Sequence, residues 1–202
     1  LGAISASVNT KSQLKQINID KANSNSSVSI SNKGKGTLYV RLIRSGIPSA
    51  GQETAKQSNL QMNVTYKTVK GDIIDVSQLE QGTDFIAEVT VYHPGIKPTY
   101  RNMALTQIFP SGWEIHNSRM DENVSASTKS DIPTYQDIRD DRVYTYFDVN
   151  QAGNRTYRVM LNAAYTGRFY LPTCYTEAMY DNNVNARIPG KWIEVVNQGV
   201  SQ

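Results

Sequence analysis

The chain has 202 residues, of which 39% are hydrophobic and 19% charged, a balance typical of globular proteins and too apolar for a disordered one. The formal net charge is only +3, from 21 basic and 18 acidic residues, and no block of like charges indicates an arm for nucleic acid or membrane lipid. The single cysteine, Cys174, excludes an intrachain disulfide and a cysteine-rich zinc site, and no apolar run approaches the roughly 20 residues of a membrane helix.

The N-terminal part contains two short stretches of alternating apolar residues, at 13–20 ("QLKQINID") and 36–46 ("GTLYVRLIRSG"). A segment rich in Asn and Ser separates them, and residues 46–59, with Gly, Pro and Ser, are typical of a linker. So few strands bury too little apolar surface to form a stable sheet alone. We therefore expect residues 1–52 to be part of a β domain whose other strands are missing, or to pack on the rest. Because the chain begins without Met or a basic leader, we also expect a piece of a longer protein.

From residue 60 onward, apolar and polar residues alternate with a period of two. The clearest runs are 84–93 ("DFIAEVTVYH"), 142–149 ("RVYTYFDV") and 156–167 ("TYRVMLNAAYTG"), with shorter ones at 63–69 and 190–196. This alternation predicts strands that bury one face and expose the other, as in an antiparallel sheet. The residues predicted to face the core are Phe85, Ala87, Val89, Val91, Val143, Phe147, Val149, Tyr157, Val159, Leu161 and Ala163. No helical stripe extends over three turns, so we predict an all-β fold, an antiparallel β-sandwich over residues 53–202.

Residues 116–134 are polar and have no periodic apolar face, which predicts a long loop that is more prone to disorder than any other segment of the chain. The stretch "SQLEQG", at 77–82, resembles the Cys-x-Glu-Gln of thioester proteins, but Gln78 stands where the thiol would be. No thioester can form there, and we interpret the stretch as a polar turn before the strand at Phe85. His93, His116 and Cys174 lie in different regions, so nothing in the sequence supports a Cys–His catalytic pair.

The densest charge in the chain lies at 134–149, "TYQDIRDDRVYTYFDV". Five charged residues fall within six positions: Asp137, Arg139, Asp140, Asp141 and Arg142. A calcium loop needs acidic or amide oxygens at alternate positions and a glycine, whereas the arginines here repel a cation. A glycosidase needs two carboxylates that face each other across a cleft, for which neighbours in one turn are poor candidates. We therefore expect no metal or catalytic site, but a salt-bridged turn before the strand at 143–149.

Residues 177–195, "EAMYDNNVNARIPGKWIEV", allow two interpretations. In the first, an Asn-rich turn follows Met179 and Tyr180, and Tyr180 is half buried at the end of a strand. In the second, a loop presents Met179 and Tyr180 as an apolar tip to a partner surface. Residue preferences alone favour the first.

Several ordered blocks resemble a known family: "LTQIFPSGWEIHN", "YQDIRDDRVYTYFD", "YTGRFYLPTCYTEAMYDNNVNAR" and "GKWIEV". They are similar to the C-terminal domain of bacterial α2-macroglobulins, called MG10, which corresponds to the receptor-binding domain of animal homologues. "GTLYVRLIRSGIP" resembles the end of the CUB domain that precedes MG10. The resemblance implies a macroglobulin- or immunoglobulin-like sandwich over 53–202 and the end of a CUB-like domain, with the linker, over 1–52.

The resemblance also implies a function. Such proteins are large, lie in the bacterial periplasm or cell envelope, in some cases with a lipid anchor, and trap proteases that cleave a bait region. A thioester, where present, captures the protease covalently. In those members the C-terminal domain covers the thioester with an apolar loop, which Met179 and Tyr180 match best. We expect a non-enzymatic chain with no cofactor, whose partners are the thioester and macroglobulin-like domains of its parent. Contact with proteases would occur only through the full-length protein, and contact with nucleic acid or insertion into a membrane is not expected.

Two other classes stay open at this point. A free-standing surface adhesin or carbohydrate-binding sandwich would use Trp113, Tyr144 or Trp192 as an exposed platform. A small β-sandwich hydrolase would use Asp137 and Asp140 in a cleft.

Overall fold

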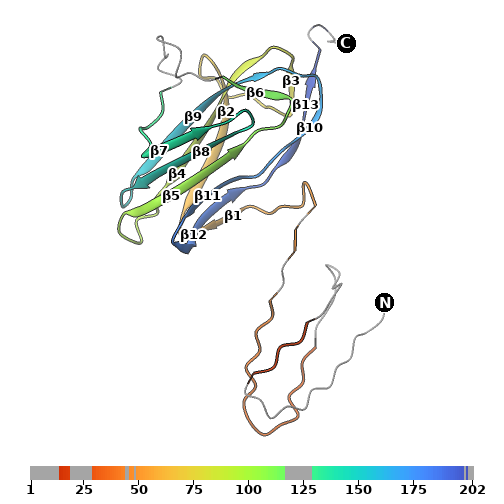
Figure 1. Cartoon of the computed structure of the whole chain (residues 1–202), viewed down its shortest axis with the longest axis vertical. Coiled ribbons are helices and arrows are strands. Elements are labelled where there is room, and N and C mark those ends of the chain that lie inside the picture. Colours follow the sequence, from red (N-terminus) through yellow and green to blue (C-terminus); the bar gives the residue numbers. More distant parts are fainter. Residues whose placement is uncertain are drawn as a thin grey trace. The chain divides into compact units, whose positions relative to one another are not determined.

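The computed structural model describes residues 14–18, 29–43, 46–47, 49–116, 129–197 and 199, which contain thirteen β-strands and no helix (Figure 1). Accordingly, no helix in these ranges is long and apolar enough to cross a membrane. Contacts divide the chain into two units, residues 1–45 and residues 46–202, each considered by itself. The all-β prediction is confirmed.

The described residues of the first unit contain no strand, so the strands predicted at 13–20 and 36–46 are not formed there. Their large apolar side chains are exposed: Leu14, Ile17, Leu38, Tyr39, Val40, Leu42 and Ile43. An alternating sequence becomes a strand where a neighbouring strand pairs its backbone and a core covers its apolar face. The described part of this unit supplies neither, so the prediction of strands was wrong there.

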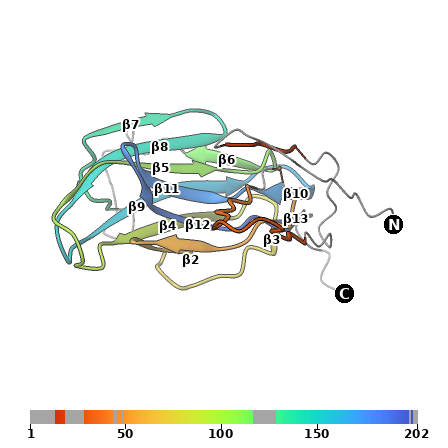
Figure 2. The same cartoon turned by 90° about the horizontal axis from the view of Figure 1, so that it is seen from below.

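The second unit is built from three sheets. The six-stranded sheet has the order β1-β12-β11-β5-β8-β7, with bounds Lys56–Ser58, Asp181–Ile188, Cys174–Ala178, Tyr100–Ile108, Arg142–Val149 and Tyr135–Ile138. The four-stranded sheet has the order β2-β4-β9-β6, with bounds Gln61–Thr68, Asp84–Tyr92, Asn154–Ala163 and Trp113–His116. The small sheet has the order β10-β13-β3, with bounds Gly167–Leu171, Lys191–Val196 and Gln78–Glu80. Figure 2 shows the strands running along one common direction.

The core lies between the sheets and confirms the predicted alternation. All eleven residues predicted to face inward from β4, β8 and β9 are buried. Phe147 packs on Tyr157 with ring centroids 5.0 Å apart, and Phe85 packs edge-on against Trp113 at 4.8 Å. These two pairs belong to two separate clusters of buried apolar residues. The first cluster contains Phe147 and Tyr157, and the second contains Phe85 and Trp113.

The segments between the predicted strands are more ordered than the sequence indicates. The expected linker at 46–59 contains β1, which pairs with β12 through Lys56↔Arg187 and Ser58↔Asn185. The expected polar turn at 77–82 contains β3, which pairs in parallel with β13 and buries Leu79. Both strands are only three residues long, too short for a two-residue period to be visible.

Candidate functional site

Four turns gather at one end of the second unit, the lower end in Figure 1. They are residues 59–60 between β1 and β2, 93–99 between β4 and β5, 150–153 between β8 and β9, and 179–180 between β11 and β12. We call this surface the four-turn end. Loops at the end of a rigid sandwich are a common place for binding surfaces, because the strands fix where each turn points.

The β11–β12 hairpin presents Met179 and Tyr180 at this end. Ala178 pairs with Asp181, so these two residues form the whole loop. Neither has a positive φ, unlike the residues of the usual two-residue hairpin turns, and a bulge between Glu177 and Ala178 accompanies the turn. Met179 is 48% exposed and Tyr180 83% exposed. The interpretation of a half-buried Tyr180 before an Asn-rich turn was wrong, because Asp181 already begins β12.

Backbone and side-chain contacts fix this hairpin from both sides. The N–H of Met179 donates to the carbonyl of Asn102 at 3.0 Å, and the N–H of Asn102 donates to Oδ1 of Asp148 at 2.9 Å. Asn102 has φ +54°, a conformation that Asn tolerates better than most residues. On the other side, Nζ of Lys97 lies 2.9 Å from Oδ2 of Asp181. This ion pair raises the pKa of Lys97 and holds the pKa of Asp181 below its ordinary value.

The turn at 93–99 is ordered around the buried ring of His93. This ring stacks on Tyr100 at 3.9 Å between centroids. The N–H of Gly95 donates to Nδ1 of His93 and Nε2 lies within reach of the carbonyl of Pro98, both at 2.9 Å. Because Nδ1 accepts from the N–H of Gly95, Nε2 is the ring nitrogen that donates to the carbonyl of Pro98. The N–H of His93 donates to the carbonyl of Gly153, which ties this turn to the one at 150–153.

The charged cluster forms the turn between β7 and β8. Nε of Arg139 lies 2.9 Å from Oδ2 of Asp137, and Arg142 binds Asp141 through two contacts, at 2.7 Å and 2.6 Å. Hydrogen bonding to Arg142 holds the pKa of Asp141 below its ordinary value. Asp140 is exposed at the tip of the turn. In the described part of the chain, no three His, Cys, Asp or Glu side chains gather as a metal ion would require.

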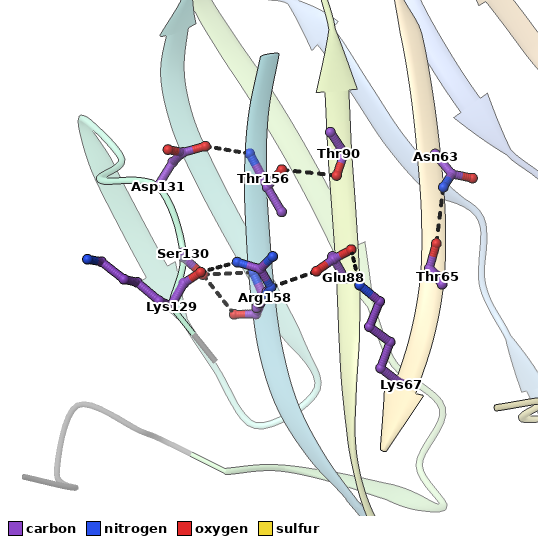
Figure 3. A network of polar contacts seen from close by, with 10 residues as sticks. All are labelled: Asn63, Thr65, Lys67, Glu88, Thr90, Lys129, Ser130, Asp131, Thr156 and Arg158. Carbon is purple, nitrogen blue, oxygen red and sulfur yellow. Dashed lines mark hydrogen bonds and ion pairs between the residues drawn. The ribbon is translucent and has the colours of Figure 1, made fainter. Parts of the chain in front are cut away.

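A second polar network lies on the outer face of the four-stranded sheet (Figure 3). Glu88 on β4 accepts from Nζ of Lys67 on β2 at 2.7 Å and from Nε of Arg158 on β9 at 2.6 Å. The Glu88 side chain is only 13% exposed. Burial by itself would raise the pKa of Glu88, but the hydrogen bonds and positive charges of Lys67 and Arg158 together outweigh it and hold that pKa below its ordinary value. Lys67, Glu88 and Arg158 thus join three strands side by side.

The same network holds the end of the long polar segment predicted at 116–134. Residues 117–128 lie outside the described residues, so the prediction of a disordered loop is not tested there. Ser130 and Asp131 hydrogen-bond to the backbone of Arg158 and Thr156, respectively, along the edge of β9 (Figure 3). The carbonyl of Lys129 accepts from the guanidinium of Arg158. Among the described residues, β6 pairs with 160–163 of β9, and residues 129–131 lie along the part of that edge that precedes residue 160.

The residues considered for other chemistry are not brought together. Sγ of Cys174 lies 4.0 Å from the sulfur of Met62, and burial raises the pKa of the Cys174 thiol to about 12. Such a thiol is almost entirely protonated at neutral pH and is a poor nucleophile. It borders an apolar groove of about 220 Å³ together with Tyr66 and Leu171. His93 lies instead within the turn at 93–99.

The three aromatic residues considered as a platform for a carbohydrate-binding module differ in their exposure. Trp113 is buried, with 3% of its surface exposed. Trp192 is half exposed, but the guanidinium of Arg168 lies 4.8 Å from its ring centroid, and Tyr170 packs edge-on against it at 5.4 Å. Tyr144 is partly buried and its hydroxyl accepts from Arg142 at 3.2 Å. The three rings therefore do not share one open face.

The geometry defines an antiparallel β-sandwich domain that presents an ordered, partly apolar loop surface at one end. Residues 60–183 match the family model described as the bacterial alpha-2-macroglobulin MG10 domain. This match covers more than half of the sequence, and the chain therefore belongs to the bacterial α2-macroglobulin MG10 family.

Curated relatives and solved structures agree with this assignment. The chain is 28% identical over 160 residues to an alpha-2-macroglobulin of Rickettsia conorii, a match covering 78% of the chain and 8% of the relative. It is 23% identical over 184 residues to an alpha-2-macroglobulin homolog of Yersinia pestis, covering 81% of the chain and 9% of the relative. The chain thus spans about a tenth of the length of these relatives.

Two solved structures show the same fold. Native Escherichia coli alpha-2-macroglobulin from domain MG7 to the C-terminus matches with a TM-score of 0.64 at 16% identity, over 74% of this chain and 25% of that one. Salmonella alpha-2-macroglobulin reacted with methylamine matches with a TM-score of 0.64 at 21% identity, over 75% of this chain and 10% of that one. Both are multi-domain proteins, which is consistent with packing of this domain against other parts of a parent.

Sequence reasoning missed most of the supports of the hairpin. Lys97, Asn102 and Asp148 are distant in sequence from Met179, and no local pattern connects them. The stretch "HPGIKP", residues 93–98, carries a turn signal that can be recognised in the sequence. The ion pair between Lys97 in this stretch and Asp181 depends on which strands are neighbours in the sheets, and composition and periodicity do not specify this.

Proposed function

We propose that this chain is the non-catalytic C-terminal part of a bacterial α2-macroglobulin-like protease inhibitor. In this proposal, Met179 and Tyr180 pack on the thioester domain of the parent and cover its thioester until activation moves the domains apart. The observation that carries the proposal is the exposure of these two large side chains on a hairpin that is fixed on both sides.

Such a cover acts by exclusion. A thioester is an acyl group that water and small amines can attack, and a bulky apolar side chain over it keeps them away. The cover needs no acid, base or nucleophile, and the four-turn end offers Met179, Tyr180 and Ile96 as exposed apolar groups. A hairpin with little freedom loses little conformational entropy when it docks, so it can hold this position efficiently.

The rest of the proposal concerns the parent. We place it in the bacterial periplasm or cell envelope, and assign residues 1–52 to the end of a CUB-like domain. The exposed apolar side chains of residues 36–43 support this assignment, since they need strands from elsewhere to cover them. The partners are the thioester and macroglobulin-like domains, and a protease meets this chain only in the full-length protein.

The proposal is tested in the full-length parent by its reaction with methylamine before any protease is added. Met179→Ser and Tyr180→Gly should each speed the reaction, because each admits the amine to the thioester. Tyr180→Phe keeps the ring and serves as the matched control, with the rate of the wild type. Unchanged rates in both Met179→Ser and Tyr180→Gly, or a parent that does not react with methylamine at all, would contradict the proposal.

A further inference from the structure

The turn at 93–99 lies beside the hairpin and carries its own exposed apolar side chain. Ile96 is 71% exposed. It lies between Gly95, with φ +82°, and Lys97, whose side chain reaches Asp181. The ion pair therefore joins the residue that follows Ile96 to the residue that follows Tyr180.

An isolated exposed isoleucine on a mobile loop would need no explanation. This turn is instead held at several points. The His93 ring is clamped by Gly95 and Pro98, and the carbonyl of Gly95 accepts from Nε2 of Gln151 at 3.0 Å. Ile96 is thus presented by a fixed backbone, as Met179 and Tyr180 are.

The lysine and the aspartate that join the two turns are paired with each other. Lys97 and Asp181 neutralise each other at 2.9 Å, and both ring nitrogens of His93 are hydrogen-bonded within the turn at 93–99. The carboxylate of Asp148, near the end of β8, accepts from the N–H of Asn102. The three exposed apolar side chains beside this ion pair fit an apolar partner surface, because burying apolar area is favourable and the paired Lys97 and Asp181 leave no free charge for a charged partner.

We propose that the docking surface comprises two turns, with Ile96 as a third contact residue beside Met179 and Tyr180 and Lys97 as the positioning residue that aligns the two turns through Asp181. Its occupant is the apolar, uncharged surface around the thioester in the thioester domain of the same parent. This inference rests on the proposed function of Met179 and Tyr180 and extends it to the turn at 93–99.

Lys97 is the residue at which to test the alignment. Asp181 also accepts through Oδ1 from the N–H and Nδ2 of Asn183, at 3.0 Å and 3.1 Å, so replacing Asp181 would disturb β12 as well. Lys97→Met keeps the length of the side chain and removes the ion pair, whereas Lys97→Arg retains it. Lys191 offers a matched control, since it pairs with Asp75 at 3.5 Å and is 43% exposed against 41% for Lys97.

The experiment measures the methylamine reaction rate of the full-length parent at low and at high salt. Ile96→Ser should raise the rate by about tenfold, the effect expected from removing one large apolar side chain from an interface. Lys97→Met should give a smaller rise, Lys97→Arg the wild-type rate, and Lys191→Met no change. Added salt should raise the rate of the wild type but not that of Lys97→Met, because salt screens the ion pair.

The outcomes distinguish the proposed function of the hairpin from the inference about the turn at 93–99. If Tyr180→Gly and Met179→Ser accelerate the reaction but Ile96→Ser and Lys97→Met do not, the hairpin alone forms the cover and the two-turn surface is wrong. If Tyr180→Gly and Met179→Ser also leave the rate unchanged, the proposed function itself fails. If Lys191→Met accelerates as much as Lys97→Met, the effect of Lys97 is general destabilisation and its positioning role is refuted.

Discussion

Replacing Glu88 by Gln tests the network that joins β2, β4 and β9. The substitution keeps the shape of the side chain but removes its charge and turns one acceptor oxygen into a donor. In the wild type, Glu88 contacts Lys67 at 2.7 Å and Arg158 at 2.6 Å. The glutamine can keep only one of these two contacts. We expect the free energy of unfolding to fall.

The magnitude follows from how buried the three groups are. A hydrogen bond to a charged group contributes about 1.5–3 kcal/mol. Lys67 and Arg158 keep 27% and 24% of their side-chain surface exposed, so water can compensate part of the loss. We therefore expect a decrease of about 2 kcal/mol, below the cost of breaking a fully buried ion pair.

The assay is urea denaturation of the chain, followed by the fluorescence of its two tryptophans, the buried Trp113 and the half-exposed Trp192. Glu80→Gln, at an exposed position of β3, is the matched control and should unfold like the wild type. Because the pKa of Glu88 lies below its ordinary value of 4.5, its contribution is present above that value and is lost as the pH falls through the lowered pKa. The difference between wild type and Glu88→Gln should shrink there. A difference from the control below about 0.5 kcal/mol at neutral pH would refute this account of the network.

Three further predictions concern the core, the thiol and the charged turn. Phe147→Ala should lower the free energy of unfolding by about 4 kcal/mol in the same urea assay, because it opens a cavity beside Tyr157, and a loss below about 1 kcal/mol would mean that this ring is not in the core. Cys174 should react with iodoacetamide far more slowly in the folded chain than in urea, as followed by mass spectrometry, since burial raises its pKa to about 12; equal rates would show an accessible thiolate. Asp140→Asn should leave the melting temperature unchanged and Asp141→Asn should lower it slightly, whereas a stabilisation of the wild type by Ca²⁺ that is lost in Asp140→Asn would reveal a metal site.

The sequence predicts the long strands of the sandwich well, because a strand with one buried face has an apolar residue at every second position. In β9, Tyr157, Val159, Leu161 and Ala163 alternate with less buried residues, and in β4 the predicted Phe85, Ala87, Val89 and Val91 are all buried, together with Ile86 between them. The short strands β1 and β3, with three residues each, have no such pattern. Their place is decided by pairing with β12 and β13, which lie more than a hundred residues away.

The candidate surface is predictable only in part. Met179 and Tyr180 attract attention as large apolar residues before a polar stretch, yet their exposure depends on a two-residue loop that sequence preferences did not favour. The contribution of Lys97 is invisible in the sequence, since it results from the packing of the turn at 93–99 beside β12. The strands predicted at 13–20 and 36–46 fail in the described residues for a related reason, because alternation alone cannot supply a neighbouring strand.

The central claim is that other domains of the parent cover Met179 and Tyr180 until activation. Hydroxyl-radical footprinting of the full-length parent, before and after trypsin cleaves the bait region, measures this most directly. Mass spectrometry gives the modification rates of both side chains, relative to a free peptide of the same sequence. We predict low rates before cleavage, and afterwards rates that match the exposure of 48% for Met179 and 83% for Tyr180. Rates that are already high in the uncleaved parent would contradict the account.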